Sequence, residues 1–289
     1  MLEILVNADN TLGECALWCE RSGRFMWTDI LGSTLWTHSP ATGQTQSWPM
    51  PERLASFALT ATVDRLLLGL ASRLAFYDFS SGSVTTITEV EAELTTRLND
   101  GRCDRHGRFV FGTFNEAQSG AAPRQAIGSF YRLDTDLSLQ RLPLPHVAIA
   151  NSICFSPDGL TMYYCDSAER VIRCCDYSEN GDLANDRVFA AVTGDGEPDG
   201  SCIDAEGYLW NAQWGGAKLV RYAPDGSVER VLGTPASQPS CVCIGGASLD
   251  TLLATSARVG LAAPQPADGA LLFARLDQIR GLPESRFGG

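Results

Sequence analysis

Hydrophobic and polar residues alternate over short segments of the chain, and turns rich in glycine, serine, aspartate and proline separate these segments. One segment, residues 24–29, follows the turn Ser22-Gly23 and precedes a second alternating segment at residues 34–38. Alternation with a period of two residues between such turns is typical of β-strands with one buried face. Since no segment has a sustained helical period, the pattern predicts an all-β fold.

This arrangement of two strands and a turn returns along the chain at a regular interval. Copies begin near residues 22, 64, 104, 156, 204 and 248. Their spacing of about 40 to 50 residues is the period of a four-stranded propeller blade. We therefore predict that residues 1–289 form a single domain, a six-bladed β-propeller with four-stranded antiparallel blades around a central channel.

Two further features of the sequence bear on this ring. The apolar segment 2–6 has no neighbouring strand, and pairing with the last blade would close the ring and protect its exposed edge. The third and fourth repeats contain additional residues at 115–127 and 178–197. We expect these additional residues to form loops over one face of the ring.

Charge and composition narrow the range of partners and compartments. The chain has 34 acidic and 22 basic residues and a net charge of −12 at pH 7, so we expect it to bind neither nucleic acid nor an anionic membrane. No apolar run approaches the roughly 18 residues of a membrane span, and the first residues lack the basic start of a signal peptide. Ten cysteines without a Cys-x-x-Cys pair are typical of structural thiols in a reducing compartment, which predicts a cytoplasmic protein.

Acidic and amide residues recur at one phase of the repeat, in segments 12–15, 97–101, 150–154 and 197–201. Each segment is predicted to lie just before a strand that opens a blade, near one end of the channel. Asn-Asp-Gly and Pro-Asp-Gly are also ordinary turn sequences. The segment 197–200, however, differs in phase from the Pro-Asp-Gly hairpin turns at 156–159 and 223–226.

Three oxygen-bearing side chains from these segments, Glu14, Asn151 and Asp199, would together form a cup for a divalent cation. Carboxylate and amide oxygens suit hard cations, and two negative charges match one doubly charged ion. Calcium, magnesium, manganese, zinc and ferrous iron all remain candidates. Open coordination positions would be left for water and substrate.

Short motifs from most of the chain support this choice of residues. They are Gly13-Glu14-x-x-x-Trp18, Arg97-x-Asn99-Asp100-Gly101, Gly112-Thr113, Asn151-x-x-x-x-Ser156-Pro157-Asp158-Gly159, Pro198-Asp199-Gly200, Asp204-x-Glu206-Gly207-x-Leu209-Trp210 and Cys243-x-Gly245-Gly246. Together they resemble the senescence marker protein-30/gluconolactonase family, also called the regucalcin-like proteins. The resemblance extends from Gly13 to about Gly260.

The resemblance implies a six-bladed propeller that holds one metal ion through Glu14, Asn151 and Asp199. It also implies substrate contacts by Arg97 and Asn99, and more loosely by Glu116. The sequence departs from the family pattern in three places: Asn151-Ser152 replaces the usual Asn-Gly, Leu98 stands where many members have proline, and the lid-like segment 115–127 is the least similar part.

The function that the resemblance implies is metal-dependent hydrolysis of a sugar lactone, such as arabinono-, galactono- or gluconolactone. We hypothesise that the ion polarises the lactone carbonyl and that Asp199 is both a ligand and the general base. Arg97 would bind substrate oxygens and Asn99 a substrate hydroxyl. Two alternatives remain: an aryl-ester or organophosphate hydrolase on the same propeller, and a non-enzymatic calcium-binding or interaction propeller.

Overall fold

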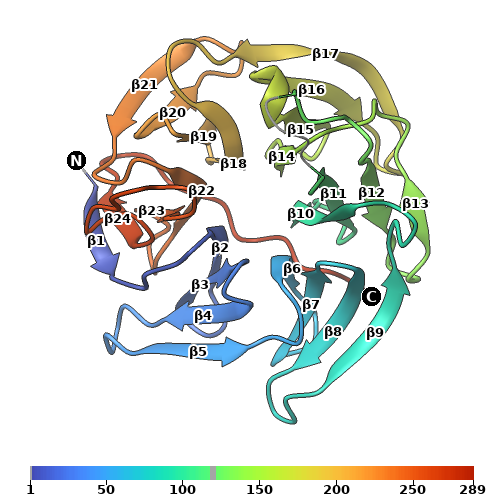
Figure 1. The fold of residues 1–289 in the computed structure, drawn as a ribbon, viewed down its shortest axis with the longest axis horizontal. Helices are drawn as coiled ribbons and strands as arrows, with labels where there is room; N and C mark the ends of the chain where they lie inside the picture. Colours follow the sequence, from blue (N-terminus) through green and yellow to red (C-terminus); the bar gives the residue numbers. More distant parts are fainter. Residues whose placement is uncertain (1, 118–121) are drawn as a thin grey trace.

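Six four-stranded antiparallel sheets form a ring in the part of the chain that the computed structural model describes, residues 2–117 and 122–289 (Figure 1). This arrangement confirms the predicted all-β six-bladed propeller. Each sheet is one blade, and its first strand lies innermost, beside the central channel.

The four strands of each blade follow one another from the channel outwards. Blade 1 contains β2 (Gly13–Cys19), β3 (Arg24–Asp29), β4 (Thr34–His38) and β5 (Thr45–Pro49); blade 2 contains β6 (Leu54–Leu59), β7 (Arg65–Leu70), β8 (Arg73–Asp78) and β9 (Val84–Glu89). Blade 3 contains β10 (Thr96–Cys103), β11 (Phe109–Asn115), β12 (Phe130–Leu133) and β13 (Leu139–Arg141); blade 4 contains β14 (Ala150–Phe155), β15 (Thr161–Asp166), β16 (Val171–Tyr177) and β17 (Leu183–Ala191). Blade 5 contains β18 (Glu197–Ile203), β19 (Leu209–Trp214), β20 (Lys218–Tyr222) and β21 (Val228–Gly233); blade 6 contains β22 (Pro239–Gly245), β23 (Thr251–Ser256), β24 (Leu271–Arg275) and β1 (Glu3–Val6). The short 3₁₀ helix η1 (Ser167–Glu169) follows β15.

The N-terminal strand closes the ring, as the sequence predicts. β1 pairs antiparallel with β24, with Glu3 opposite Phe273 and Ile4 opposite Leu272. The first strand of the chain is therefore the outermost strand of the last blade. This pairing satisfies the backbone groups of an edge that would otherwise be open.

The prediction of a loop at 178–197 is wrong for residues 183–191. Residues 183–191 form β17, the outermost strand of blade 4, which pairs with β16. Because β17 lies at the outer edge, nearly all of its side chains are exposed or partly exposed, and Ala190 is its buried residue. A strand exposed on both faces lacks the alternation that identifies a strand in a sequence. Within the other segment, residues 118–121 lie outside the described part of the chain.

The acidic and amide segments lie within the innermost strands rather than before them, which corrects the sequence-based placement. Each of these strands contains a β-bulge, so its register with the next strand shifts. A bulge interrupts the alternation of buried and exposed residues and turns polar side chains towards the channel. The start of the strand therefore cannot be recognised from the sequence pattern. The shifts lie between Glu14 and Leu17 in β2, Leu98 and Gly101 in β10, Asn151 and Cys154 in β14, and Pro198 and Ser201 in β18.

A C-terminal strap, residues 277–289, crosses the ring at the face where the innermost strands end (Figure 1). The backbone carbonyl oxygen of Arg280 accepts a hydrogen bond from the amide of Ala205 at 2.8 Å, and the Phe287 amide donates to Leu59 O at 2.8 Å. Glu284 forms an ion pair with Arg102 at 3.0 Å. The strap thus covers the end of the channel that lies opposite the acidic and amide residues.

All ten cysteines are free and buried, which agrees with their prediction as small apolar residues. Several line the channel beside the strap, among them Cys103, Cys154 and Cys202. The described residues contain no helix with the length and apolar character needed to cross a membrane.

Candidate functional site

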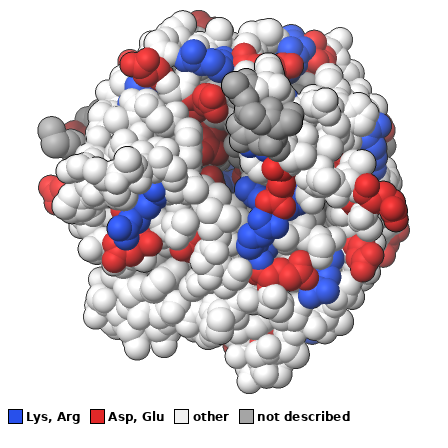
Figure 2. Space-filling model, viewed as in Figure 1, with Lys and Arg blue, Asp and Glu red and all other residues white. Residues whose placement is uncertain are grey.

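A cavity of about 340 Å³ opens at the face of the ring where the innermost strands begin. It brings together all six side chains that the sequence indicates, and Figure 2 shows a hollow at the centre of this face with acidic and basic atoms in and around it. The cavity is lined by Leu12, Glu14, Leu31, Arg97, Asn99, Phe114, Glu116, Arg124, Ile149, Asn151, Ser167, Glu197, Asp199, Trp214 and Val259.

Two carboxyl groups line this cavity, those of Glu14 in β2 and Asp199 in β18, and the pKa values of both are raised. Burial raises the pKa of Glu14 to about 8, and the nearby charge of Asp100 adds to this effect. Burial also raises the pKa of Asp199 well above its ordinary value, followed by repulsion from Glu14 and then Asp100. The carboxyl oxygen Oδ1 of Asp199 is buried and has no hydrogen-bond partner among the described residues. Both groups therefore favour the protonated form unless a positive charge joins them.

The side-chain amide of Asn151 has a defined orientation beside this pair. Its Oδ1 accepts a hydrogen bond from Asn99 Nδ2 at 3.1 Å, and its Nδ2 donates to Ser167 Oγ at 2.9 Å. Ser167 in turn donates to the backbone carbonyl of Pro198 at 2.7 Å. These bonds orient the amide of Asn151, which is 5% exposed, without using every lone pair on Oδ1.

The hydroxyl contacts of Ser152 explain how the chain tolerates serine at a position where the family pattern has glycine. Its φ of 60° lies in the left-handed region that glycine adopts most readily. The hydroxyl of Ser152 donates to the backbone carbonyl of Asp199 at 2.7 Å, and that carbonyl also accepts from Asn211 Nδ2 at 2.9 Å. These contacts tie β14 to β18 and hold Asp199 against blade 4.

Asp100 makes the matching connection between blades 3 and 4. Its carboxylate accepts from the amide of Gly101 at 2.9 Å and from the amide of Ile153 at 2.7 Å. Asp100 therefore ties down its own bulge and the neighbouring one. It acts on the site through the backbone and through its charge.

The residues present fit a divalent cation. The described residues contain no group of three His, Cys, Asp or Glu side chains placed to hold a metal ion. The predicted trio includes only two such residues, and its third oxygen is the amide of Asn151. An unpartnered carboxylate oxygen, two carboxyl groups with raised pKa values and an oriented amide form an all-oxygen donor set, which suits a hard cation.

Arg97 lies on the blade 3 side of the cavity and is 5% exposed. Its Nη1 donates to Leu98 O at 2.8 Å and to Asn99 Oδ1 at 2.6 Å. The guanidinium carbon lies 4.5 Å from the centre of the Phe114 ring. Burial lowers the pKa of Arg97 to about 10, with a smaller opposing effect from Glu116, so Arg97 is still positively charged at neutral pH.

Glu116 is held by a second arginine, which the sequence does not single out. Arg53, before β6, donates to the two carboxylate oxygens of Glu116 at 2.5 and 2.8 Å. The nearest approach of Glu116 to Arg97 is longer, 3.7 Å from Nε to Oε1. The hydrogen bonds from Arg53 are the main reason that the pKa of Glu116 is lowered.

Several other lining residues are absent from the sequence-based set. Phe114 directly follows the Gly112-Thr113 motif, and this position is the signal by which it could have been found. Ser167 and Trp214 have no comparable signal. Ser167 follows β15 and Trp214 ends β19, and both strands pair with innermost strands whose register is shifted by a bulge. Leu12, Ile149 and Trp214 add apolar surface to the lining of the cavity.

The chain is similar to known proteins over almost its whole length. The L-arabinolactonase of Azospirillum brasilense is 52% identical over 291 residues, which cover 99% of this chain and 95% of the relative. The 6-deoxy-6-sulfogluconolactonase of Pseudomonas putida is 30% identical over 295 residues, which cover 100% of this chain and 99% of the relative. A crystal structure from Agrobacterium tumefaciens, described as a calcium-binding protein, regucalcin, has a TM-score of 0.90 with 30% identity and covers 98% of this chain and 96% of that one.

The family model for the SMP-30/Gluconolactonase/LRE-like region matches residues 12–258, which include every predicted site residue. The chain therefore belongs to the SMP-30/gluconolactonase/LRE-like family.

Proposed function

We propose that this protein is a hydrolase that opens a sugar lactone to the sugar acid, a step of carbohydrate metabolism. The observation that carries the proposal is the single cavity in which a carboxylate pair, an oriented amide and a buried arginine meet. The relatives named L-arabinolactonase and 6-deoxy-6-sulfogluconolactonase support a lactone of a single sugar. We place arabinonolactone first, ahead of galactono- and gluconolactone, because the arabinolactonase shares 52% identity.

Glu14, Asn151 and Asp199 would hold one divalent cation. The bound cation would supply Lewis acidity that polarises the lactone carbonyl. A relative of similar fold described as calcium-binding supports calcium as one candidate, beside magnesium, manganese, zinc and ferrous iron. The positive charge would also favour the ionised forms of both carboxyl groups.

Asp199 is the proposed general base. The bound cation would keep the Asp199 carboxylate ionised, and an ionised carboxylate beside the reacting water can take a proton from it. The oxygen of that water attacks the lactone carbonyl carbon, and the bond from this carbon to the ring oxygen breaks. The ring oxygen receives the proton and becomes a hydroxyl group, so the product is the open sugar acid.

Arg97 and Asn99 orient the substrate in this proposal. Arg97 uses Nη1 within the protein and its Nε lies 3.7 Å from Glu116, so Nη2 is the group proposed to donate to lactone oxygens. Both hydrogens of Asn99 Nδ2 are directed to protein acceptors, Ala150 O and Asn151 Oδ1. Asn99 can therefore receive a hydrogen bond from a substrate hydroxyl at Oδ1, and it also links the arginine to the amide of the cup.

Arg53 is a positioning residue for this arrangement. By binding both oxygens of Glu116, it keeps that carboxylate from neutralising Arg97. Without Arg53, Glu116 would form a closer ion pair with Arg97, and the substrate would have to compete with Glu116 for the guanidinium group. Arg53 thus acts on the substrate through two other side chains.

Replacing Asp199 with Asn should lower kcat for sugar lactones by about 10² to 10⁴, because an amide cannot take a proton from water. The rate is followed by acid release with a pH indicator, on a panel of aldonolactones, aryl esters and phosphotriesters. The control is Glu197→Gln, which removes a carboxylate from the edge of the same cavity and should keep activity within about threefold. Full activity of Asp199→Asn would exclude Asp199 as the general base. Wild-type turnover confined to aryl esters or phosphotriesters would exclude a sugar lactone as the substrate.

Replacing Arg53 with Gln should raise KM for the lactone by about tenfold and lower kcat by less than about fivefold, because the substitution impairs substrate binding more than the chemical step. The double variant R53Q/E116Q should recover part of this loss, because the competing carboxylate is gone. Arg73→Gln, which breaks a similar exposed pair with Glu52, is the control. An unchanged KM in R53Q, or no recovery in the double variant, would argue against the positioning role.

The metal-free protein should lose stability as the pH rises. The pKa of Glu14 is about 8 in the folded protein against an ordinary value of 4.5, so the folded state binds more protons than the unfolded state between these limits. The free energy of unfolding therefore falls as pH increases through this window. Glu14→Gln removes that charge and should stabilise the metal-free protein by roughly 2 kcal/mol at pH 8, with no gain at pH 4.5.

Urea unfolding in the presence of a chelator measures this effect, with Glu197→Gln as the control for loss of a negative charge. The two variants should differ at pH 8 and agree at pH 4.5. Equal stability of both variants at pH 8 would show that Glu14 is not held in a repulsive, desolvated position.

A further inference from the structure

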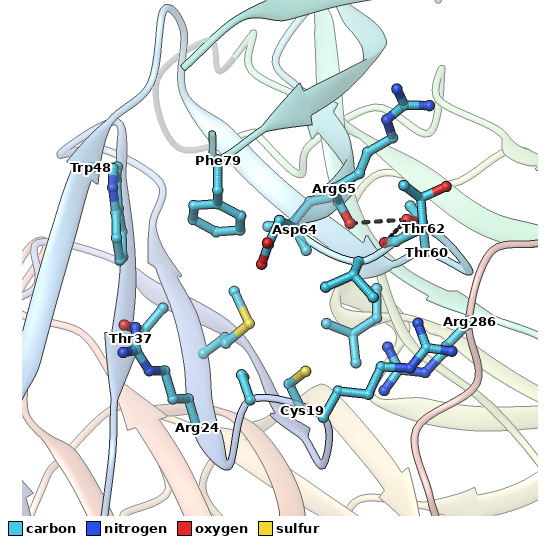
Figure 3. Close-up of a pocket in the computed structure, with 16 residues that line it drawn as sticks. Cys19, Arg24, Thr37, Trp48, Thr60, Thr62, Asp64, Arg65, Phe79 and Arg286 are labelled. Atoms are coloured by element: carbon cyan, nitrogen blue, oxygen red, sulfur yellow. Dashed lines mark hydrogen bonds between the residues drawn. The ribbon is translucent and has the colours of Figure 1, made fainter. Parts of the chain in front are cut away.

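A second cavity, of about 410 Å³, lies between blades 1 and 2 and is shown in Figure 3. It is formed at the ends of β2 and β6, by the turns that follow these strands and by Arg286 of the C-terminal strap. The candidate lactonase site lies where the innermost strands begin. The two cavities are therefore on opposite faces of the ring.

Apolar and aromatic side chains form one wall of this second cavity. The rings of Trp48 and Phe79 lie 5.2 Å apart, edge to face, and both face the open space in Figure 3. Met26 and Leu66 also line the cavity. Trp48 and Phe79 each keep part of their surface exposed, so the wall offers a planar ligand an apolar contact.

Guanidinium groups stand around this wall. Arg21 donates to Ala61 O at 2.8 Å and Arg24 to Gln46 Oε1 at 2.8 Å, and neither forms an ion pair within the described part of the chain. Arg286 forms an ion pair with Glu20 at 3.4 Å. In a chain with a net charge of −12, two arginines without a carboxylate partner thus lie beside one apolar wall.

Two other charged residues, Arg65 and Asp64, also line the cavity. The guanidinium of Arg65 is directed away from the cavity and lies 5.3 Å from the centre of the Phe76 ring, so it does not contribute. Asp64 is the acidic residue among the lining side chains. Since Arg286 is paired with Glu20, Arg21 and Arg24 against Asp64 leave one surplus positive charge next to the apolar wall.

We propose that this cavity binds an organic anion with a planar apolar body, of the class of aromatic carboxylates and sulfonates. The anionic group would bind Arg21 and Arg24, whose remaining N–H groups suit two-pronged contact with such oxygens. The ring would pack on Trp48 and Phe79. An inorganic anion would leave this apolar wall in water, and an uncharged ring would leave the arginines without a partner.

The probe is 1-anilinonaphthalene-8-sulfonate, an aromatic sulfonate whose fluorescence increases when it leaves water. Wild-type protein should bind it saturably with one site per chain. The double variant R21Q/R24Q should bind it about tenfold more weakly, and so should Trp48→Leu. The control R230Q/R275Q removes the same charge from exposed positions on blades 5 and 6 and should bind as the wild type does.

The uncharged analogue N-phenyl-1-naphthylamine separates charge recognition from general apolar adsorption, and it should bind the wild type about tenfold more weakly than the sulfonate. Circular dichroism of each variant verifies its fold. The proposal is overturned if wild-type binding does not saturate at one site, if R21Q/R24Q binds as tightly as R230Q/R275Q, or if the uncharged analogue binds equally well. None of these results depends on lactone hydrolysis.

Discussion

Placing Glu14 and Asp199 in one cavity costs free energy, because burial and mutual repulsion both disfavour their charged forms. A less constrained chain could relieve this cost by turning either side chain outwards. In this ring the carboxyl groups are held inwards by strands that the other blades fix in place. The chemistry proposed for the cavity depends on this arrangement, because two carboxyl groups held close to an amide oxygen attract a cation.

The scaffold supplies that constraint through the bulges and the bonds between blades. Each bulge turns a polar side chain towards the channel, and the residues around it are then tied to the neighbouring blade. Ser152 and Asn211 hold the backbone carbonyl of Asp199, while Asp100 holds the amide of Ile153. Closure of the ring by β1 at one edge, and the strap across the far face, limit how far the blades can separate. The positions of the site residues thus follow from the whole ring.

The sequence was sufficient for the number of blades and their closure because the turn and strand pattern repeats and because the segment 2–6 has no other partner. Glu14, Asn151 and Asp199 were identified from their shared phase and family resemblance, and the structure places them in one cavity. β17 was missed because an outer strand exposed on both faces carries no alternation. Arg53 was missed because its contact with Glu116 joins residues from blades 2 and 3 that no local pattern relates.

A calorimetric titration of the metal-free protein with each candidate cation tests the proposed cation site most directly. The wild-type protein should bind at least one of these cations with a stoichiometry of one per chain. Glu14→Gln and Asp199→Asn should each weaken that binding by at least about tenfold, or 1.4 kcal/mol, whereas Glu197→Gln should change it little. Equal affinity in all four proteins, or no binding by the wild type, would contradict a cation held between Glu14, Asn151 and Asp199.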